Sequence, residues 1–157
     1  MKKTFFILLI SVVTLFSCKK DDADCPEVST TAPAAEVTNL RTYLQTNNIT
    51  ATEDPRGFFY RIEVAGTGGK PSVCTDYITV NYAGTYTDGV RFDAGNNVSF
   101  RLSNLITGWQ EGIPLIAKGG SMFLYLPPSL AYGANPPPPI RPNAIMIFKM
   151  DLTDIQR

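Results

Sequence analysis

The feature that most constrains the fold is a series of short apolar-rich stretches separated by glycine turns, which starts at Gly57. In the first stretch, residues 58–64, apolar side chains recur at every second position, and the glycine cluster 66–69 then turns the chain. Further on, Asp88-Gly89 supplies the positive φ angles that a tight hairpin turn needs. A period of two residues between such turns predicts antiparallel β-structure.

Four further strands and one short helix complete the expected domain. We expect the strands at residues 77–82, 98–102, 122–126 and 144–152. Residues 109–117 form an apolar-faced segment that indicates one or two helical turns, and Pro114 inside it removes a backbone hydrogen bond and keeps it short or kinked. The expected fold class is therefore α+β, with an antiparallel β-sheet of about five strands and one short α-helix.

The N-terminus has the pattern of an export signal. Lys2 and Lys3 precede an apolar stretch, residues 5–16, which is too short to span a bilayer comfortably, so residues 1–17 are expected to be a signal peptide. Cys18 follows directly and resembles the acylated cysteine of bacterial lipoproteins, with an apolar residue three positions before it and a small residue just before it. This resemblance implies a lipid anchor at Cys18 and a location in the bacterial cell envelope, at the outer membrane or facing the periplasm. The alternative is an ordinary signal peptide next to an incidental cysteine.

Two segments separate this signal from the β-rich domain, which is expected to span residues 54–157. Residues 18–33 are expected to be the acylated cysteine and a flexible tether, because the stretch is rich in Thr, Ser, Pro and Ala. Residues 34–48 predict a short amphipathic helix that could pack on its own domain or form a homodimer. The apolar residues that carry this pattern are Val37, Leu40, Tyr43 and Leu44.

Composition excludes several kinds of chemistry. The 157 residues include no His and only three Cys, so catalytic machinery based on His is excluded, and we expect no metal site and no cofactor. The 14 basic and 14 acidic residues cancel, and no basic run is present, which argues against nucleic acid as a partner. In an exported chain a disulfide between Cys25 and Cys74 is favoured over two unpaired thiols.

Several aromatic residues lie at or near turns, so their side chains could serve a role other than filling the core. Such positions suit the floor and rim of an apolar pocket with a few polar groups, and Asp93 adds one carboxylate. The alternative is that these residues are ordinary core aromatics. The aromatics concerned are Tyr82, Phe92, Trp109, Tyr132 and Phe148.

Four ordered blocks of sequence favour the pocket. They read VNYAG with DGVRFD (80–84 and 88–93), LITGWQEG (105–112), PSLAYG (128–133) and IRPNAIMIF (140–148). Together these blocks resemble the signature of peptidyl-prolyl isomerases of the FK506-binding-protein (FKBP) type, over about two thirds of the chain.

The resemblance implies a bent antiparallel sheet wrapped around the short helix, with a proline-binding pocket between them. It implies a peptidyl-prolyl cis–trans isomerase that accelerates rotation about X–Pro bonds in exported proteins without a covalent intermediate. Its partners would be proline-containing polypeptides, with macrolides of the FK506 and rapamycin type as inhibitors. The alternative is a non-catalytic binding or chaperone module of the cell envelope that keeps the isomerase fold.

The resemblance also assigns roles to residues of the pocket. Trp109 would be the floor under the proline ring, and the Ile106 N–H and the Tyr132 hydroxyl would bind substrate carbonyls. Asp93, held by Tyr82, would contribute electrostatically at the rim, and these four residues, Asp93, Tyr132, Ile106 and Trp109, form the implied catalytic group. The implied substrate-binding set is Tyr82, Phe92, Val98, Leu105, Ile106, Trp109, Tyr132, Ile140 and Phe148.

Three departures from the family pattern concern the walls of the pocket. Val98 stands where the family often has a phenylalanine, which predicts a shallower wall at that point. Four consecutive prolines, residues 136–139, occupy the loop that overhangs the pocket in this family, and Arg141 replaces a common proline. A polyproline segment favours a stiff rim, which could alter peptide preference or be a connector without influence on substrates.

Overall fold

The computed structural model of the protein describes residues 30–74 and 76–156. The expected signal peptide, Cys18 and Cys25 lie outside the described residues. None of the helices in the described part is long and apolar enough to cross a membrane.

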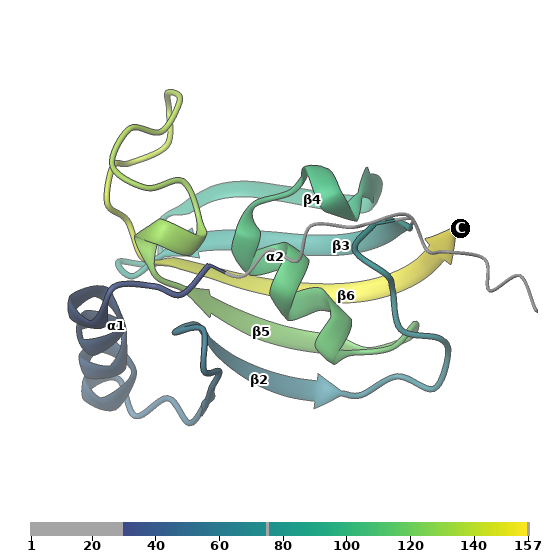
Figure 1. The fold of residues 1–157 in the computed structure, drawn as a ribbon, viewed down its shortest axis with the longest axis horizontal. Helices are drawn as coiled ribbons and strands as arrows, with labels where there is room; N and C mark the ends of the chain where they lie inside the picture. Colours follow the sequence, from purple (N-terminus) through teal and green to yellow (C-terminus); the bar gives the residue numbers. More distant parts are fainter. Residues whose placement is uncertain (1–29, 75, 157) are drawn as a thin grey trace, which may run out of the picture.

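The described chain forms one antiparallel sheet and two α-helices (Figure 1). The sheet has six strands in the spatial order β1-β2-β5-β6-β3-β4. The expected α+β class is confirmed, and the strand beyond the expected five is the two-residue β1. The bounds are α1 Ala34–Thr46, β1 Thr52–Glu53, β2 Phe59–Val64, β3 Tyr77–Tyr86, β4 Arg91–Arg101, α2 Thr107–Gly112, β5 Ser121–Leu126 and β6 Met146–Gln156. Short 3₁₀ turns, η1 to η3, lie at Leu102–Asn104, Ile113–Leu115 and Pro128–Leu130.

The hairpin between β3 and β4 turns where the sequence predicts it. Gly89 has a φ of +82°, and the Tyr86 N–H donates to the Val90 carbonyl at 2.9 Å. Both strands are longer than expected, because β3 runs to Tyr86 and β4 starts as early as Arg91. Pairing with β3 therefore includes Arg91 and Asp93, at the end of the DGVRFD block.

Helix α2 lies across one face of the sheet (Figure 1). Its close approach depends on Gly108 and Gly112, because a Cβ atom on either would collide with the side chains of Leu126 and Leu124 on β5. The helix is short, as expected, and continues as the 3₁₀ turn η2, which contains Pro114. The core between helix and sheet is fully buried at Leu124 and Leu126.

Helix α1 packs on its own domain through the apolar face that the sequence predicts. Val37 is 8%, Leu40 0% and Leu44 4% exposed, and all three belong to the hydrophobic core. Near the N-terminus of the helix, the Ala32 N–H donates to the Arg56 carbonyl at 2.8 Å. Of the two interpretations of this helix, packing on the domain is the one observed.

Candidate functional site

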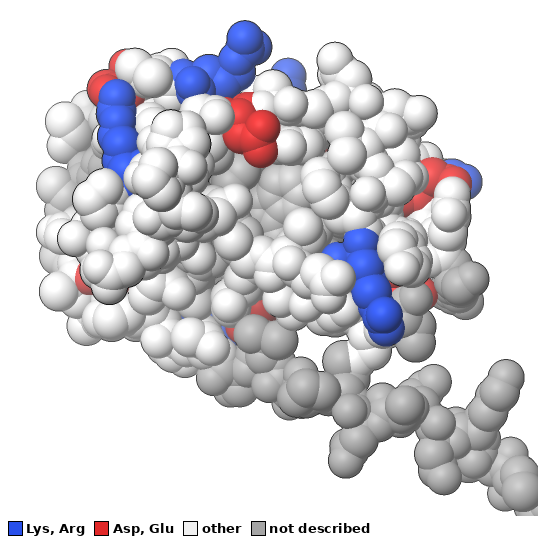
Figure 2. All heavy atoms as spheres, turned by 90° about the horizontal axis from the view of Figure 1, so that it is seen from above, with Lys and Arg blue, Asp and Glu red and all other residues white. Residues whose placement is uncertain are grey.

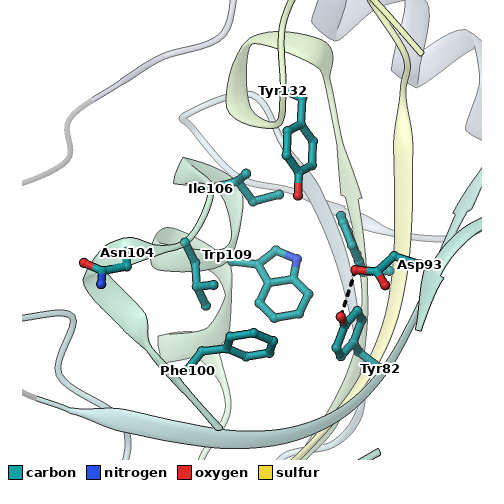
Figure 3. A pocket seen from close by; sticks show the side chains of 9 residues that line it. Tyr82, Asp93, Phe100, Asn104, Ile106, Trp109 and Tyr132 are labelled. Carbon is teal, nitrogen blue, oxygen red and sulfur yellow. Dashed lines mark hydrogen bonds between the residues drawn. The ribbon is translucent and has the colours of Figure 1, made fainter. Parts of the chain in front are cut away.

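A pocket of about 220 Å³ opens between α2 and the sheet. Residues from β3, β4, β6, the η1–α2 segment and the loop after η3 surround it (Figure 3). Charged side chains of both signs are scattered over the face shown in Figure 2, and most of that surface is uncharged. The residues that line the pocket are Tyr82, Asp93, Phe100, Asn104, Leu105, Ile106, Trp109, Tyr132 and Phe148.

Trp109 lies at the centre of this lining, with three aromatic rings set almost perpendicular to its own. The ring centroids of Tyr82 and Phe148 lie 5.2 and 5.1 Å from that of Trp109, at interplanar angles of 85° and 84°. Phe100 adds a third edge contact at 6.1 Å and 84°. Such edge-to-face packing fixes ring orientations, so the indole is held as a rigid apolar surface at the base of the pocket.

The indole nitrogen supplies one polar atom at this base. Nε1 of Trp109 is buried and has no hydrogen-bond partner within the described part of the chain. In Figure 3 it points toward the side of the pocket where Asp93 and Tyr132 lie. Buried donors in proteins are nearly always paired, so this N–H, unpaired among the described residues, is an exception at the base of the pocket.

Gly84 explains how the aromatic wall can form on β3. A Cβ atom at Gly84 would lie 2.5 Å from the Phe92 ring and 3.0 Å from that of Phe148. The rings of Phe92 and Phe148 meet edge to face above this glycine, with centroids 5.5 Å apart. Phe92 thus supports Phe148 from behind and is not among the residues that line the pocket.

Tyr82 and Asp93 form the polar side of the pocket. The Tyr82 hydroxyl donates to Asp93 Oδ2 at 2.8 Å, and the Ala94 N–H donates to Asp93 Oδ1 at 2.8 Å. Burial, followed by the hydrogen bond and the charge of Asp93, raises the pKa of Tyr82 to about 12. Both carboxylate oxygens are therefore held in place, and the phenol stays neutral at physiological pH.

Tyr132 reaches the mouth of the pocket from the loop that follows η3 (Figure 3). Its side chain is 38% exposed, and burial of the hydroxyl, together with the charge of Asp93, raises its pKa. The neutral phenol keeps its proton and can donate a hydrogen bond to a carbonyl. Ile106 lies opposite as the N-cap residue of α2, and its side chain points into the same space.

Besides Phe92, two more of the sequence-predicted site residues do not line the pocket. Val98 pairs with Val80 in the β3–β4 ladder and does not line the pocket. Ile140 lines a separate shallow hollow in the proline-rich loop, together with Pro136, Pro138 and Pro139. Phe92, Val98 and Ile140 therefore do not line this pocket, while the other six residues of the predicted substrate-binding set do.

Phe100 and Asn104 line the pocket and were not predicted. The register of β3 against β4 shifts between Val80 and Tyr82, where Asn97 adopts a φ of +55°. Phe100, two residues beyond Val98 on the same strand, packs against Tyr82 and Trp109. The only signal for it in the sequence is the two-residue period, which places Phe100 on the same strand face as Val98.

The described residues contain no group of three or more acidic or cysteine side chains that could hold a metal ion. Cys74 is disulfide-bonded. Its predicted partner, Cys25, lies outside the described residues.

The fold and the aromatic pocket identify the class of protein. The chain belongs to the family described as FKBP-type peptidyl-prolyl cis–trans isomerase, whose sequence profile matches residues 68–153. Among individual proteins, it is 42% identical over 104 residues to the FKBP-type peptidyl-prolyl cis–trans isomerase FkpA of Escherichia coli strain K12. That match covers 64% of this chain and 38% of FkpA.

Other relatives agree with this assignment. The Outer membrane protein MIP of Legionella longbeachae is 40% identical over 108 residues, which are 66% of this chain and 46% of that protein. The match thus spans less than half the length of these curated relatives. The crystal structure of E. coli FkpA superposes with a TM-score of 0.70 at 36% identity, covering 78% of this chain and 60% of that one. A peptidyl-prolyl cis–trans isomerase from Pseudomonas syringae pv. tomato gives 0.69 at 28% identity, covering 82% and 99%.

Proposed function

We propose that the protein catalyses cis–trans isomerisation of X–Pro peptide bonds in exported polypeptides. The observation that carries this proposal is the rigid indole of Trp109, framed by three perpendicular rings, with a hydroxyl and a carboxylate at the mouth of the same pocket. A proline ring is compact, apolar and uncharged, so it matches this base. The polar groups of the adjoining peptide then face Tyr132, Asp93 and the start of α2.

The chemistry of the reaction fits a site without histidine. Rotation about an X–Pro bond meets a barrier of roughly 18–20 kcal/mol, because amide resonance is lost in the twisted transition state. No bond to hydrogen breaks, so no general base is required. Catalysis needs a site that stabilises the twisted amide more than either planar isomer.

The pocket can favour the twisted amide over the planar isomers in two ways. Its apolar walls remove water from the amide, which disfavours the planar form because that form carries more charge separation. A hydrogen bond from Tyr132 or from the Ile106 N–H holds a neighbouring carbonyl while the bond rotates. Lowering the barrier by roughly 5–7 kcal/mol corresponds to about 10⁴–10⁵-fold acceleration.

An NMR exchange measurement on X–Pro peptides tests this proposal. We expect cis–trans exchange well above the uncatalysed rate in the presence of the protein. A protein that binds proline peptides or FK506 without accelerating exchange would instead be the non-catalytic binding or chaperone module. Binding can be followed independently by the fluorescence of Trp109, the only tryptophan in the chain.

We infer that the protein is held at a membrane of the cell envelope by lipid on Cys18. The leader pattern supports this, as does the name of the relative called Outer membrane protein MIP. Metabolic labelling with a fatty-acid analogue should mark the wild-type protein and leave Cys18→Ala unlabelled. Labelling of both proteins would contradict the inference.

Two further features of the exported chain belong to this proposal. The disulfide of Cys74 is proposed to pair with Cys25. Trypsin cuts between the two cysteines, at Arg41, Arg56 and Arg61, so tryptic fragments that stay joined only without reductant would support this pairing. A homodimer through residues 34–48 would have to use the polar face of α1, because the apolar face packs on the domain. Sedimentation of the protein at increasing concentration tests for that dimer.

A further inference from the structure

A single hydrogen bond ties helix α1 to the loop that carries Tyr132. Glu36, in the first turn of α1, accepts a hydrogen bond through Oε2 from the backbone N–H of Ser129 at 2.8 Å. The two residues are 93 positions apart, and Glu36 lies outside residues 68–153, the part that matches the family. Figure 1 shows the segment between β5 and β6 passing close to α1.

The peptide group that Glu36 holds is the same one that anchors the backbone around Tyr132. The Ser129 N–H and the Pro128 carbonyl belong to one planar peptide unit. That carbonyl accepts hydrogen bonds from the Ala131 N–H at 3.0 Å and from the Gly133 N–H at 2.9 Å. These two donors stand immediately before and after Tyr132, so the orientation of one peptide plane sets the backbone on both sides of it.

Glu36 provides a polar link between two elements that are themselves packed into the core. Val37 and Leu40, next to it on α1, are buried in the core, and Leu130 of η3 is fully buried. Tyr132, in contrast, is 38% exposed and stands at the mouth of the pocket. A charged acceptor also polarises the peptide group and strengthens the hydrogen bonds that its carbonyl receives.

We propose that Glu36 is a positioning residue for the Tyr132 hydroxyl. The helix before the family domain then contributes to the pocket without touching a substrate, by fixing the Pro128–Ser129 peptide plane. This inference rests on the proposed function for its catalytic readout. Its structural part, the dependence of the Tyr132 loop on Glu36, can be measured without any turnover.

The test compares Glu36→Ala and Glu36→Gln, each alone and combined with Tyr132→Phe, in a double-mutant cycle. We expect Glu36→Ala to lower kcat/KM about 2–5-fold, since it weakens the placement of one hydrogen bond. In the Tyr132→Phe background the same substitution should have no further effect, because the hydroxyl that Glu36 positions is already gone. Glu36→Gln keeps an acceptor oxygen without the charge, and should recover most of the activity.

Arg41→Ala is the matched control. Arg41 lies on the same helix, but it pairs with Glu53 at 2.7 Å on an exposed surface. It should leave kcat/KM unchanged, whereas a loss equal to that of Glu36→Ala would mean that any weakening of α1 lowers activity. The Glu36→Gln variant separates loss of the hydrogen-bond acceptor from loss of an acidic charge in the first turn of the helix.

Amide hydrogen exchange gives the readout that is independent of turnover. Glu36→Ala should speed exchange at Ser129, Ala131 and Gly133, while Arg41→Ala should not. Unchanged exchange at these three amides, or losses of activity that add in the double mutant, would overturn the proposal. If the wild-type protein fails to accelerate X–Pro exchange, the proposed function fails, and these three amides still decide whether Glu36 holds the loop.

Discussion

The base and the rim of the pocket are built in different ways. The base consists of rings from regular elements, and Trp109 and Phe148 are only 4% and 3% exposed. The rim carries Tyr132 on a loop without regular structure, held by backbone hydrogen bonds to one carbonyl. The same packing energy therefore stabilises the base and the fold, whereas the rim is placed by a few polar contacts. Substitutions in the base should lower stability and activity together, and substitutions in the rim should lower activity alone.

Trp109→Ala is expected to have the largest effect. Removing the indole should lower the free energy of unfolding by about 3–5 kcal/mol, because the sheet cannot close the resulting cavity. It should also lower kcat/KM by about 10²-fold, since the proline ring loses its apolar partner. Denaturant unfolding and NMR exchange, both below the melting temperature of the variant, measure the two effects. Normal turnover in a folded Trp109→Ala protein would mean that the site lies elsewhere.

Tyr132→Phe tests the rim of the pocket. The hydroxyl at the rim is proposed to donate a hydrogen bond to the substrate and makes no hydrogen bond within the described part of the chain, so kcat/KM should fall about 3–10-fold with the melting temperature unchanged. The affinity for FK506, read from Trp109 fluorescence, should fall in parallel. A drop in melting temperature comparable to that of a core substitution would break the distinction between base and rim.

The Tyr82–Asp93 pair lies between the base and the rim of the pocket. The pKa of Tyr82 depends both on burial and on the contact with Asp93. In the native state the pKa of Tyr82 is raised to about 12, whereas an unfolded tyrosine titrates near 10. The neutral phenol is therefore favoured by the fold, and its contribution to stability is complete below pH 10. It is lost as the pH rises from about 10 to about 12, because the unfolded chain then ionises first.

Asp93→Ala should lower the pKa of Tyr82, but not as far as the value of an unfolded tyrosine. Burial is the largest cause of the raised Tyr82 pKa, and the hydrogen bond and charge of Asp93 come after it. Ring NMR of ¹³C-labelled tyrosine should place the pKa of Tyr82 in the variant between 10 and 12. A value unchanged at about 12 would show that Asp93 does not influence the phenol.

Arg141→Ala is expected to have the smallest effect. The Arg141 guanidinium bonds Asp88 at 2.7 Å and lies 4.3 Å over the Tyr86 ring, while its backbone N–H donates to the Tyr86 hydroxyl at 3.0 Å. The ion pair with Asp88 is about half-exposed and the backbone bond survives the substitution, so activity and melting temperature should stay close to wild type. Arg141 holds the pKa of Asp88 below its usual range. That pKa should rise in the variant, as measured by carboxyl NMR.

The site was largely predictable because its residues fall in ordered sequence blocks next to turns. Tyr82, Asp93, Ile106, Trp109 and Tyr132 come together in the structure around one pocket. Phe100 was not predicted, because the two-residue period places Val98 and Phe100 on the same face of the strand and does not show which of them reaches Trp109. Ile140 was placed in the pocket from its sequence block, but the proline-rich loop carries it to a separate hollow.

The sequence by itself determined the strand pattern, the Asp88-Gly89 hairpin and the short helix with its tryptophan, because alternation, turn residues and proline act over a few neighbouring positions. It also identified the apolar face of residues 34–48. Only the tertiary structure decided what that face packs on and which peptide group Glu36 reaches across 93 positions. The physical reason is the sequence distance over which each interaction acts. A local pattern shows which face of a segment can be buried, whereas long-range contacts depend on how the folded sheet brings distant segments together.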